Sequence, residues 1–291
     1  MEGLSIQLIS GLAVGCIYAL IAIGFSMIYR ALGLVNFAQS EIMMLGAFVG
    51  YTVLTVFPAM PFALALVISA GLTGLAGLLI ERFAFRRAVQ KKADQVQLVL
   101  LTLGVGIVLS NAARLIWGAN PVVYAIPLVH EVYDVGGYPL PAVYVYIVAT
   151  MALLLVGLQW FFSRTWIGLA ARAASDDRDT AATMGISVGL ASAVSFVLAA
   201  STGALAGVLY APITFASYDM GAVGVKAFAA GGIGTLGSVP GAVGGGLING
   251  ISETLGGALV SNAYVDSIAF AIMILILLVR PNGLFPEGGK A

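Results

Sequence analysis

The chain has 291 residues, of which 60% are hydrophobic and only 9% are charged, and its mean hydropathy is +1.05. Soluble domains carry about 25% charged residues, so this composition indicates an integral membrane protein without a separate soluble domain. Thirteen basic and thirteen acidic residues cancel, which argues against a nucleic-acid partner. The single cysteine, Cys16, lies in an apolar stretch and excludes an internal disulfide.

Apolar runs of membrane-spanning length follow one another along the chain. They cover residues 5–29, 34–56, 62–80, 96–116, 142–162, 190–212, 220–238, 240–259 and 263–280. The first run is too long for a cleaved signal peptide and has no basic leader, so we expect it to remain as a span. The predicted fold class is an all-α integral membrane protein with about eight or nine transmembrane helices. Residues 1–291 then form a single transmembrane domain.

Polar residues and glycines interrupt three of these runs, 34–56, 220–238 and 240–259. Such segments are expected to be broken or re-entrant helices, which membranes tolerate only where the backbone is buried in protein or lines a cavity. Ionisable groups at membrane depth are costly and often mark a pathway. For each charged candidate, the alternative to a pathway role is a side chain that reaches the membrane interface or makes an interhelical hydrogen bond. The candidates for a pathway or gate are Asn36, Gln39, Glu41, Lys226, Gly231, Gly232, Gly234, Asn249 and Glu253.

Two parts of the chain resemble each other. GLAVGCIYALI at 11–21 matches GALAGVLYAPI at 203–213, and FAQSEIMMLGAFVG at 37–50 matches FAAGGIGTLGSVPG at 228–241. The matched glycines and tyrosine favour a duplicated unit over coincidence in a chain rich in glycine and alanine. The expected half-repeats are residues 5–80 and 190–280. Membrane proteins with two related halves are typically transporters.

Loop charges predict the orientation. The 81–95 connection has five basic and two acidic residues, and is therefore expected on the cytoplasmic side. The 117–141 connection has no Lys or Arg and should lie outside, whereas 163–189 carries three arginines and should lie inside. The N-terminus is then outside and the C-terminus inside. The two copies of the repeat run in opposite directions, which predicts an inverted internal repeat.

The 163–189 connection is the most informative polar segment. Ser175 or Asp176 is expected to cap a short helix over Asp177–Met184, with Gly185 ending it. Mixed charges and a small apolar face suit docking on a cytoplasmic protein better than lipid binding. A plain solvated connection is the alternative. The candidate coupling residues are Arg172, Ser175, Asp176, Asp177, Arg178, Asp179, Met184 and Gly185.

Other motifs speak against chemistry in this chain. It has no GxxxxGK[ST] segment that could hold ATP phosphates. Residues 232–237 fit GxGxxG, but the apolar flanks favour close helix packing or unwound backbone over a dinucleotide site. His130, Glu131 and Asp134 are too few for a metal site, so a plain external loop is expected and no metal is predicted. A membrane enzyme is disfavoured, because one His and one Cys leave little for acid–base or metal chemistry.

Four segments carry a resemblance to a known family that spans essentially the whole chain. They are YALIAIGFSMIYRALGLVNFAQSEIMMLGAFVG (18–50), GLAARAASDDRDTAATMGI (168–186), KAFAAGGIGTLGSVPGAVGGGLINGISE (226–253) and LVRPNGLF (278–285). In this order they resemble the membrane subunits of branched-chain amino-acid ABC importers, the LivH-type permeases.

The resemblance implies a non-catalytic permease subunit of the bacterial inner membrane, with its N-terminus periplasmic and its C-terminus cytoplasmic. Expected partners are a second homologous permease, two cytoplasmic ABC ATPase subunits, a periplasmic substrate-binding protein and the lipid bilayer. No cofactor is expected in this chain, since ATP and Mg²⁺ would bind the partner ATPases. The loop matching 164–187 would couple to the ATPase. Branched-chain or related hydrophobic amino acids are the expected substrates; alternatives are amides, urea or other small polar solutes, or an ion-coupled secondary transporter.

Overall fold

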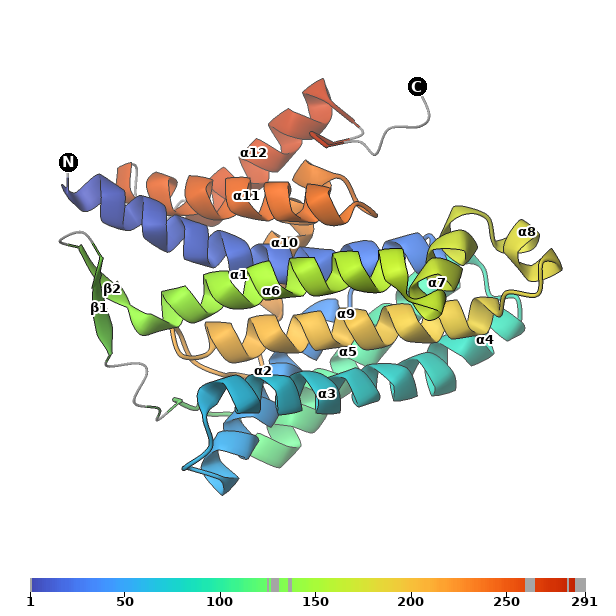
Figure 1. Cartoon of the computed structure of the whole chain (residues 1–291), viewed down its shortest axis with the longest axis horizontal. Coiled ribbons are helices and arrows are strands. Elements are labelled where there is room, and N and C mark those ends of the chain that lie inside the picture. Colours follow the sequence, from blue (N-terminus) through green and yellow to red (C-terminus); the bar gives the residue numbers. More distant parts are fainter. Residues whose placement is uncertain are drawn as a thin grey trace.

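The computed structural model describes residues 2–124, 126, 131–135, 138–259, 265–281 and 283–285, and its described part is built almost entirely of helices (Figure 1). The long helices are α1 (Glu2–Leu32), α2 (Gln39–Val56), α3 (Phe62–Ile80), α5 (Gln95–Trp117), α6 (Ala142–Arg164), α9 (Val188–Tyr210), α10 (Gly221–Gly234), α11 (Val239–Leu259) and α12 (Val265–Val279). Shorter elements connect them: the π-helix η1 (Glu81–Phe85), α4 (Arg86–Gln90), α7 (Trp166–Asp176), α8 (Arg178–Thr183), and an antiparallel hairpin of β1 (Val132–Val135) and β2 (Tyr138–Pro141).

Within the described residues, six helices are long and apolar enough to cross a membrane: α1, α2, α3 with its extension to Gln90, α5, α6 and α9. Helices α10 and α11 form a pair bent by 119°, which adds at most one more span, and α12 is shorter. The chain is therefore an all-α multi-pass membrane protein. The predicted number of about eight or nine spans is not confirmed.

The breaks explain why fewer helices qualify. Helix α1 ends at Leu32, before Gly33 with its φ of +71°, and residues 33–38 are not helical before α2 begins at Gln39. The run 34–56 is thus helical only over the 18 residues of α2. Helix α10 has 14 residues, about 21 Å at 1.5 Å per residue, which is shorter than the roughly 30 Å of hydrocarbon. Each interrupted region therefore contains a helix end at a polar or glycine-rich position.

Helix α1 lies at the centre of the bundle, against α9, α10 and α11, while α9 also packs against α2 and α3 (Figure 1). Glycines allow these close approaches, as small residues do between membrane helices. A Cβ added at Gly15 would lie 2.9 Å from the Cα of Leu247 in α11. One added at Gly207 would collide with the carbonyl oxygen of Met43 in α2. The GxxxG pairs at 11–15 and 203–207 are thus packing motifs.

The GxGxxG match at 232–237 is the turn between α10 and α11. Thr235 has a φ of +125° and Gly237 of +93°, so the helix unwinds there. The chain near its C-terminus covers this helix end: the N–H groups of Leu284 and Phe285 donate to the carbonyl oxygens of Ile233 and Gly234, at 3.0 and 3.1 Å. The expectation of unwound backbone is confirmed, and the apolar helical context excludes a dinucleotide site of the βαβ type.

The described elements divide between two ends of the bundle (Figure 1). The start of α1 and the β1–β2 hairpin lie at one end, and α4, α7 and α8 lie at the other. The connections 81–94 and 165–187, which carry most of the basic residues, are therefore on the same side.

Candidate functional site

The polar segment between α6 and α9 folds into two short helices. Thr165 caps α7, its side chain accepting a hydrogen bond from the N–H of Gly168 at 3.0 Å. Gly168 must lack a side chain, because a Cβ there would collide with the carbonyl oxygen of Phe161 at the end of α6. Helix α7 can therefore fold back directly against α6, and its buried face consists of Gly168, Ala171 and Ala174.

Helix α8 differs from the prediction at its start. The predicted cap was Ser175 or Asp176, but both belong to α7, and Ser175 donates to the carbonyl oxygen of Ala171. Asp177 is the residue whose carboxylate accepts from the N–H of Thr180, at 3.1 Å, and from its hydroxyl, at 2.6 Å. The predicted cap was wrong because Ser175 and Asp176 already belong to α7, a helix that was not predicted. Gly185, with a φ of +82°, ends the segment as predicted.

Small apolar residues attach these two helices to the bundle. Ala171 and Ala174 of α7, Ala181 of α8 and Ala191 of α9 form a cluster of their own. Met184 is 78% exposed and Trp166 is 88% exposed. The remaining coupling candidates lie on the outer side of this cluster: Arg172, Asp176 and Asp177 are exposed, and Ser175 and Arg178 are partly buried, while the side chain of Asp179 lies outside the described residues. Partial burial lowers the pKa of the Arg178 guanidinium from its ordinary value.

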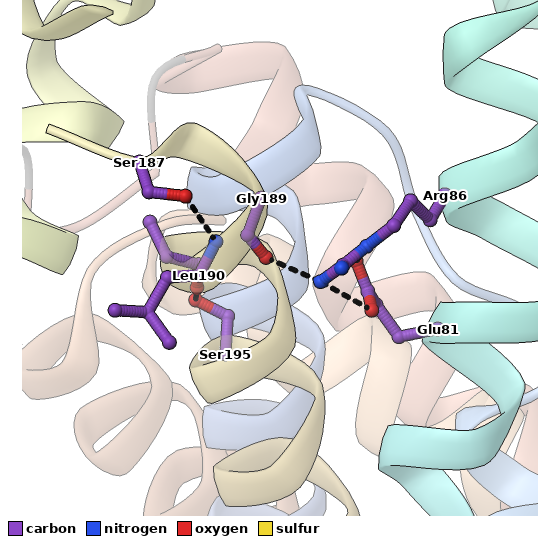
Figure 2. A network of polar contacts seen from close by, with 7 residues as sticks. Glu81, Arg86, Ser187, Gly189, Leu190 and Ser195 are labelled. Atoms are coloured by element: carbon purple, nitrogen blue, oxygen red, sulfur yellow. Dashed lines mark hydrogen bonds and ion pairs between the residues drawn. The ribbon is translucent and has the colours of Figure 1, made fainter.

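Two polar links join neighbouring elements at this end of the bundle. Arg30 at the end of α1 pairs with Asp176 of α7 at 3.3 Å. Figure 2 shows the second link, in which Arg86 donates to the carbonyl oxygen of Gly189, in the first turn of α9, at 2.9 Å. The same guanidinium lies 3.2 Å from the carboxylate of Glu81, which is buried in the π-helical segment. Helix α7 is therefore tied to the end of α1, and the segment at 81–86 is tied to the start of α9.

Asn36 and Gln39 lie at the start of α2 and are both fully buried. The Asn36 side chain accepts from the N–H of Ala38, and Gln39 donates to the carbonyl oxygen of Ala199 at 2.8 Å. Asn36 Nδ2 and Gln39 Oε1 make no hydrogen bond with any described residue. Ala199 is the middle residue of α9, so α2 begins halfway along that helix.

Glu41 lies in the first turn of α2, where the positive end of the helix dipole favours a carboxylate. Its carboxylate reaches α5 and α10, because Cβ atoms added at Gly106 and Gly221 would lie 3.3 and 2.8 Å from its oxygens. No ion pair with Glu41 occurs among the residues that the structure describes. Since Gly221 is the first residue of α10, the starts of α2 and α10 lie beside each other.

Lys226 and Glu253 form an ion pair between α10 and α11, with Nζ 2.8 Å from Oε1. Asn249, one turn before Glu253, donates to the carbonyl oxygen of Lys226 at 3.1 Å. This is the interhelical contact that was kept as the alternative to a pathway role. The pair lies next to a cavity of about 440 Å³, and Glu253 is one of the residues that line it.

The three glycine candidates are helix-end residues. Gly231 and Gly234 are buried and Gly232 faces Met273 of α12. The pathway candidates thus fall into two groups: Asn36, Gln39 and Glu41 at the start of α2, and Lys226, Asn249 and Glu253 between α10 and α11. Within the described ranges no three His, Cys, Asp or Glu side chains could hold a metal. His130 lies outside those ranges, as does the side chain of Asp134.

Sequence reasoning missed three features. Helix α7 was not predicted, although Thr165 followed by an alanine-rich amphipathic stretch is a helix-start signal. Arg30 and Arg86 were taken as ordinary boundary or loop charges, and nothing in the sequence placed them beside Asp176 and Gly189. The role of Leu284 and Phe285 in covering the end of α10 left no local signal either, since that contact joins distant segments.

Comparison with known proteins supplies the family. A family model described as branched-chain amino acid transport system / permease component matches residues 7–277. The high-affinity branched-chain amino acid transport system permease protein LivH of Escherichia coli is 34% identical, covering 98% of this chain and 96% of its own length. The permease protein BraD of Pseudomonas aeruginosa is 32% identical, with 98% and 97% covered. A probable LivH of Methanocaldococcus jannaschii is 30% identical, with 91% and 87% covered.

Proposed function

Because the chain belongs to the family of branched-chain amino acid transport permeases, we propose that it moves branched-chain or related hydrophobic amino acids across the membrane as one subunit of an ATP-driven importer. The family match over nearly the whole chain carries this proposal. The chain is a permease and not the subunit that hydrolyses ATP. It works with ATPase and substrate-binding partners, as permeases of such importers do. Supply of the substrate by a periplasmic binding protein is part of the proposal.

The finer assembly consists of a second homologous permease and two cytoplasmic ATPase subunits. ATP and Mg²⁺ bind those ATPases, and this chain holds no cofactor of its own. The whole of 1–291 acts as one transmembrane domain.

The protein is a multi-pass membrane protein, and we place it in the bacterial inner membrane with its N-terminus periplasmic and its C-terminus cytoplasmic. One observation and one general rule support this orientation. The basic 81–94 and 165–187 connections lie at one end of the bundle, opposite the β1–β2 hairpin (Figure 1). Basic loops are retained in the cytoplasm.

An inverted repeat relates α1, α2, α3 and α5 to α9, α10, α11 and α12. Helix contacts support it, because several packing pairs have a counterpart: α1 packs on α11 as α9 packs on α3, and α10 on α12 as α2 on α5. Phe37 and Phe228, which match in the sequence repeat, touch each other with ring centroids 5.9 Å apart. When two half-units are related by a two-fold axis, residues that lie on the axis contact the matching residues of the other half-unit. The half-units therefore extend beyond the predicted 5–80 and include α5.

Helices α2 and α10 form the gate region in this proposal. Helix α2 starts beside the middle of α9 and α10 starts beside the first turn of α2, so the starts of the two helices lie side by side. Broken helices that meet at the midplane of inverted repeats line the substrate routes of many transporters. The buried Asn36 and Gln39 and the partly buried Glu41 lie where the two helices start.

The α7–α8 segment couples this gate to the ATPase. Its exposed residues Arg172 and Met184 offer a docking surface, its Asp176 pairs with Arg30 of α1, and α7 packs against α1, α6 and α9. A related importer for amides, urea or other small polar solutes is the alternative within the family. An ion-coupled secondary transporter would need a titrating site at membrane depth, and Glu41 or Glu253 would have to provide it.

Reconstitution tests the function. The chain is co-purified with its partner permease and ATPases, placed in proteoliposomes, and supplied with the binding protein and radiolabelled leucine. We expect uptake that needs ATP and the binding protein. A liposome containing this chain alone serves as the control and should show none. Uptake by the chain alone down an H⁺ or Na⁺ gradient would replace the proposal with the secondary-transporter alternative.

A further inference from the structure

A large groove opens between α6 and α11, at the end of the bundle that carries α7. It has a volume of about 1020 Å³, at the upper end of the roughly 300–1,000 Å³ of small-molecule sites. Helix α1 contributes Ser26, Met27 and Arg30 to it, and α7 contributes Arg172 and Ser175. Figure 1 shows α6 and α11 on either side of α1 in this part of the bundle. The residues used above for the gate lie elsewhere.

The wall of the groove is apolar along the two flanking helices and polar at one end. Leu155 and Leu158 of α6 face Val243 of α11 across it. Towards the end of α6 the lining changes to Ser163 and Arg164. The residues that line this polar end are charged, polar or aromatic: Arg30, Gln159, Trp160, Ser163, Arg164, Arg172 and Ser175.

The polar end carries excess positive charge. Arg30 pairs with Asp176, but Arg164 and Arg172 have no acidic partner within the described part of the chain. Both side chains are exposed, as is Trp160 at 63%. Trp at this level is typical of the membrane–water interface, where its ring lies among the lipid headgroups.

We propose that this groove holds an anionic phospholipid of the cytoplasmic leaflet, with its acyl chains against α6 and α11 and its phosphate between Arg164 and Arg172. Guanidinium groups bind phosphate through charge-assisted, often paired hydrogen bonds. Basic pockets between membrane helices on the cytoplasmic side recognise anionic headgroups. The cytoplasmic placement rests on the orientation given under the proposed function; the lipid chemistry does not depend on transport.

A free amino acid fits the groove less well. Its carboxylate could pair with Arg164, but its ammonium group would need an acid. No acidic residue is among the described residues that line the groove, and Asp176 of α7 is already paired with Arg30. A lipid phosphate with apolar chains matches both the unpaired arginines and the apolar walls. A helix of the partner permease is the other possible occupant, and the experiment separates it.

Lipid retention by the purified complex provides the test. The complete complex is washed in detergent, and its bound phosphatidylglycerol and phosphatidylcholine are counted by native mass spectrometry. We expect the wild type to retain phosphatidylglycerol in preference, and Arg164→Gln to lower this retention about fivefold, the factor that corresponds to ~1 kcal/mol per arginine near an anionic lipid. Arg82→Gln removes an exposed arginine at the same end outside the groove and should change nothing.

A second pair of variants tests the acyl-chain wall without a change of charge. Val243→Trp fills the groove and should displace the lipid, whereas Val148→Trp, on an exposed position of α6 outside the groove, should not. Equal loss in Arg164→Gln and Arg82→Gln, or equal retention of both lipids, would overturn the proposal. So would an efficient disulfide cross-link from Val243→Cys to the partner permease. Because retention is counted without transport, a complex that fails to import leucine still gives a clear answer here.

Discussion

Lys226 and Glu253 place two opposite charges between α10 and α11, where their side chains are 19% and 13% exposed. Charges at membrane depth are tolerated when they neutralise each other. Asn249 holds the backbone of Lys226 in place through its side-chain amide. This ion pair joins two helices, so we expect its loss to affect the stability of the folded protein first.

The charge pair predicts unequal effects of single and double substitutions. Lys226→Met and Glu253→Gln should each destabilise the complex by ~3–5 kcal/mol, since each leaves a buried charge without its partner. The double variant should be close to the wild type. Denaturant unfolding of the purified complex in detergent measures this, with the exposed Lys91→Met as the control. Single variants as stable as the double one would contradict the pairing.

Glycines that face another backbone predict a second residue-scale contrast. Gly207→Ala would drive a Cβ into the carbonyl oxygen of Met43, and overpacking of this kind costs ~1–3 kcal/mol. Gly104→Ala, on α5, meets no atom within 4 Å. It should be neutral or gain up to ~1 kcal/mol from better helix propensity. The denaturant midpoints of unfolding of both variants measure this difference. Equal midpoints would show that α2 and α9 are not in tight contact.

Residue types alone identified the polar positions but not their partners. Asn36, Gln39 and Lys226 were recognisable because polar side chains are rare in such apolar runs. That Gln39 bonds to Ala199, 160 residues away, depends on packing between segments that the sequence does not align.

Helix ends decide how the elements are arranged. The unwound turn after α10 contains Thr235 at a φ of +125°, which is unusual for a β-branched residue. The segment at 284–285 stabilises that turn by donating two backbone N–H groups to the last carbonyls of α10. This gives the LVRPNGLF motif a structural role.

Leu284→Pro tests that role, because proline has no N–H to donate to Ile233. Loss of one hydrogen bond, worth ~1 kcal/mol, should speed amide hydrogen exchange about fivefold in residues 231–238. Leu284→Ala keeps the N–H and serves as the control. If both variants exchange at the same rate, the backbone contact does not hold the helix end.

At the element scale the sequence predicted the long helices well and their ends poorly. Apolar runs such as 142–162 coincide with α6 because hydrophobicity alone determines a membrane helix. The start of α2 at Gln39 is bound to α9 by a hydrogen bond, and α7, which was not predicted, ends at Asp176 in an ion pair with Arg30 of α1. The cap of α8 was displaced for that reason.

The whole molecule has one end rich in basic loops and one without them. Loop charges predicted this from the sequence because orientation in membranes follows local Lys and Arg. The packing of α3 on α9 and of α11 on α1 could not be predicted from the sequence, since contacts between distant segments leave no local signal.

Cysteine labelling tests the orientation. Val123→Cys and Val89→Cys replace exposed residues at the two ends, and the native Cys16 is buried. A membrane-impermeant maleimide added to intact spheroplasts should label position 123 and leave position 89 unlabelled until the membrane is opened. The opposite labelling pattern would contradict this orientation and would place α7 and α8 on the outer side.

The coupling of ATP hydrolysis to transport through α7 and α8 is the central claim. The most direct measurement is the number of ATP molecules hydrolysed per leucine imported by the reconstituted complex. Gly185→Val forces a side chain onto a backbone φ of +82°, and Arg172→Glu reverses an exposed charge on α7. Both variants should assemble and hydrolyse ATP while import falls by about tenfold or more, which corresponds to a barrier higher by at least ~1.4 kcal/mol. Wild-type import with an unchanged ratio in both variants would contradict the account.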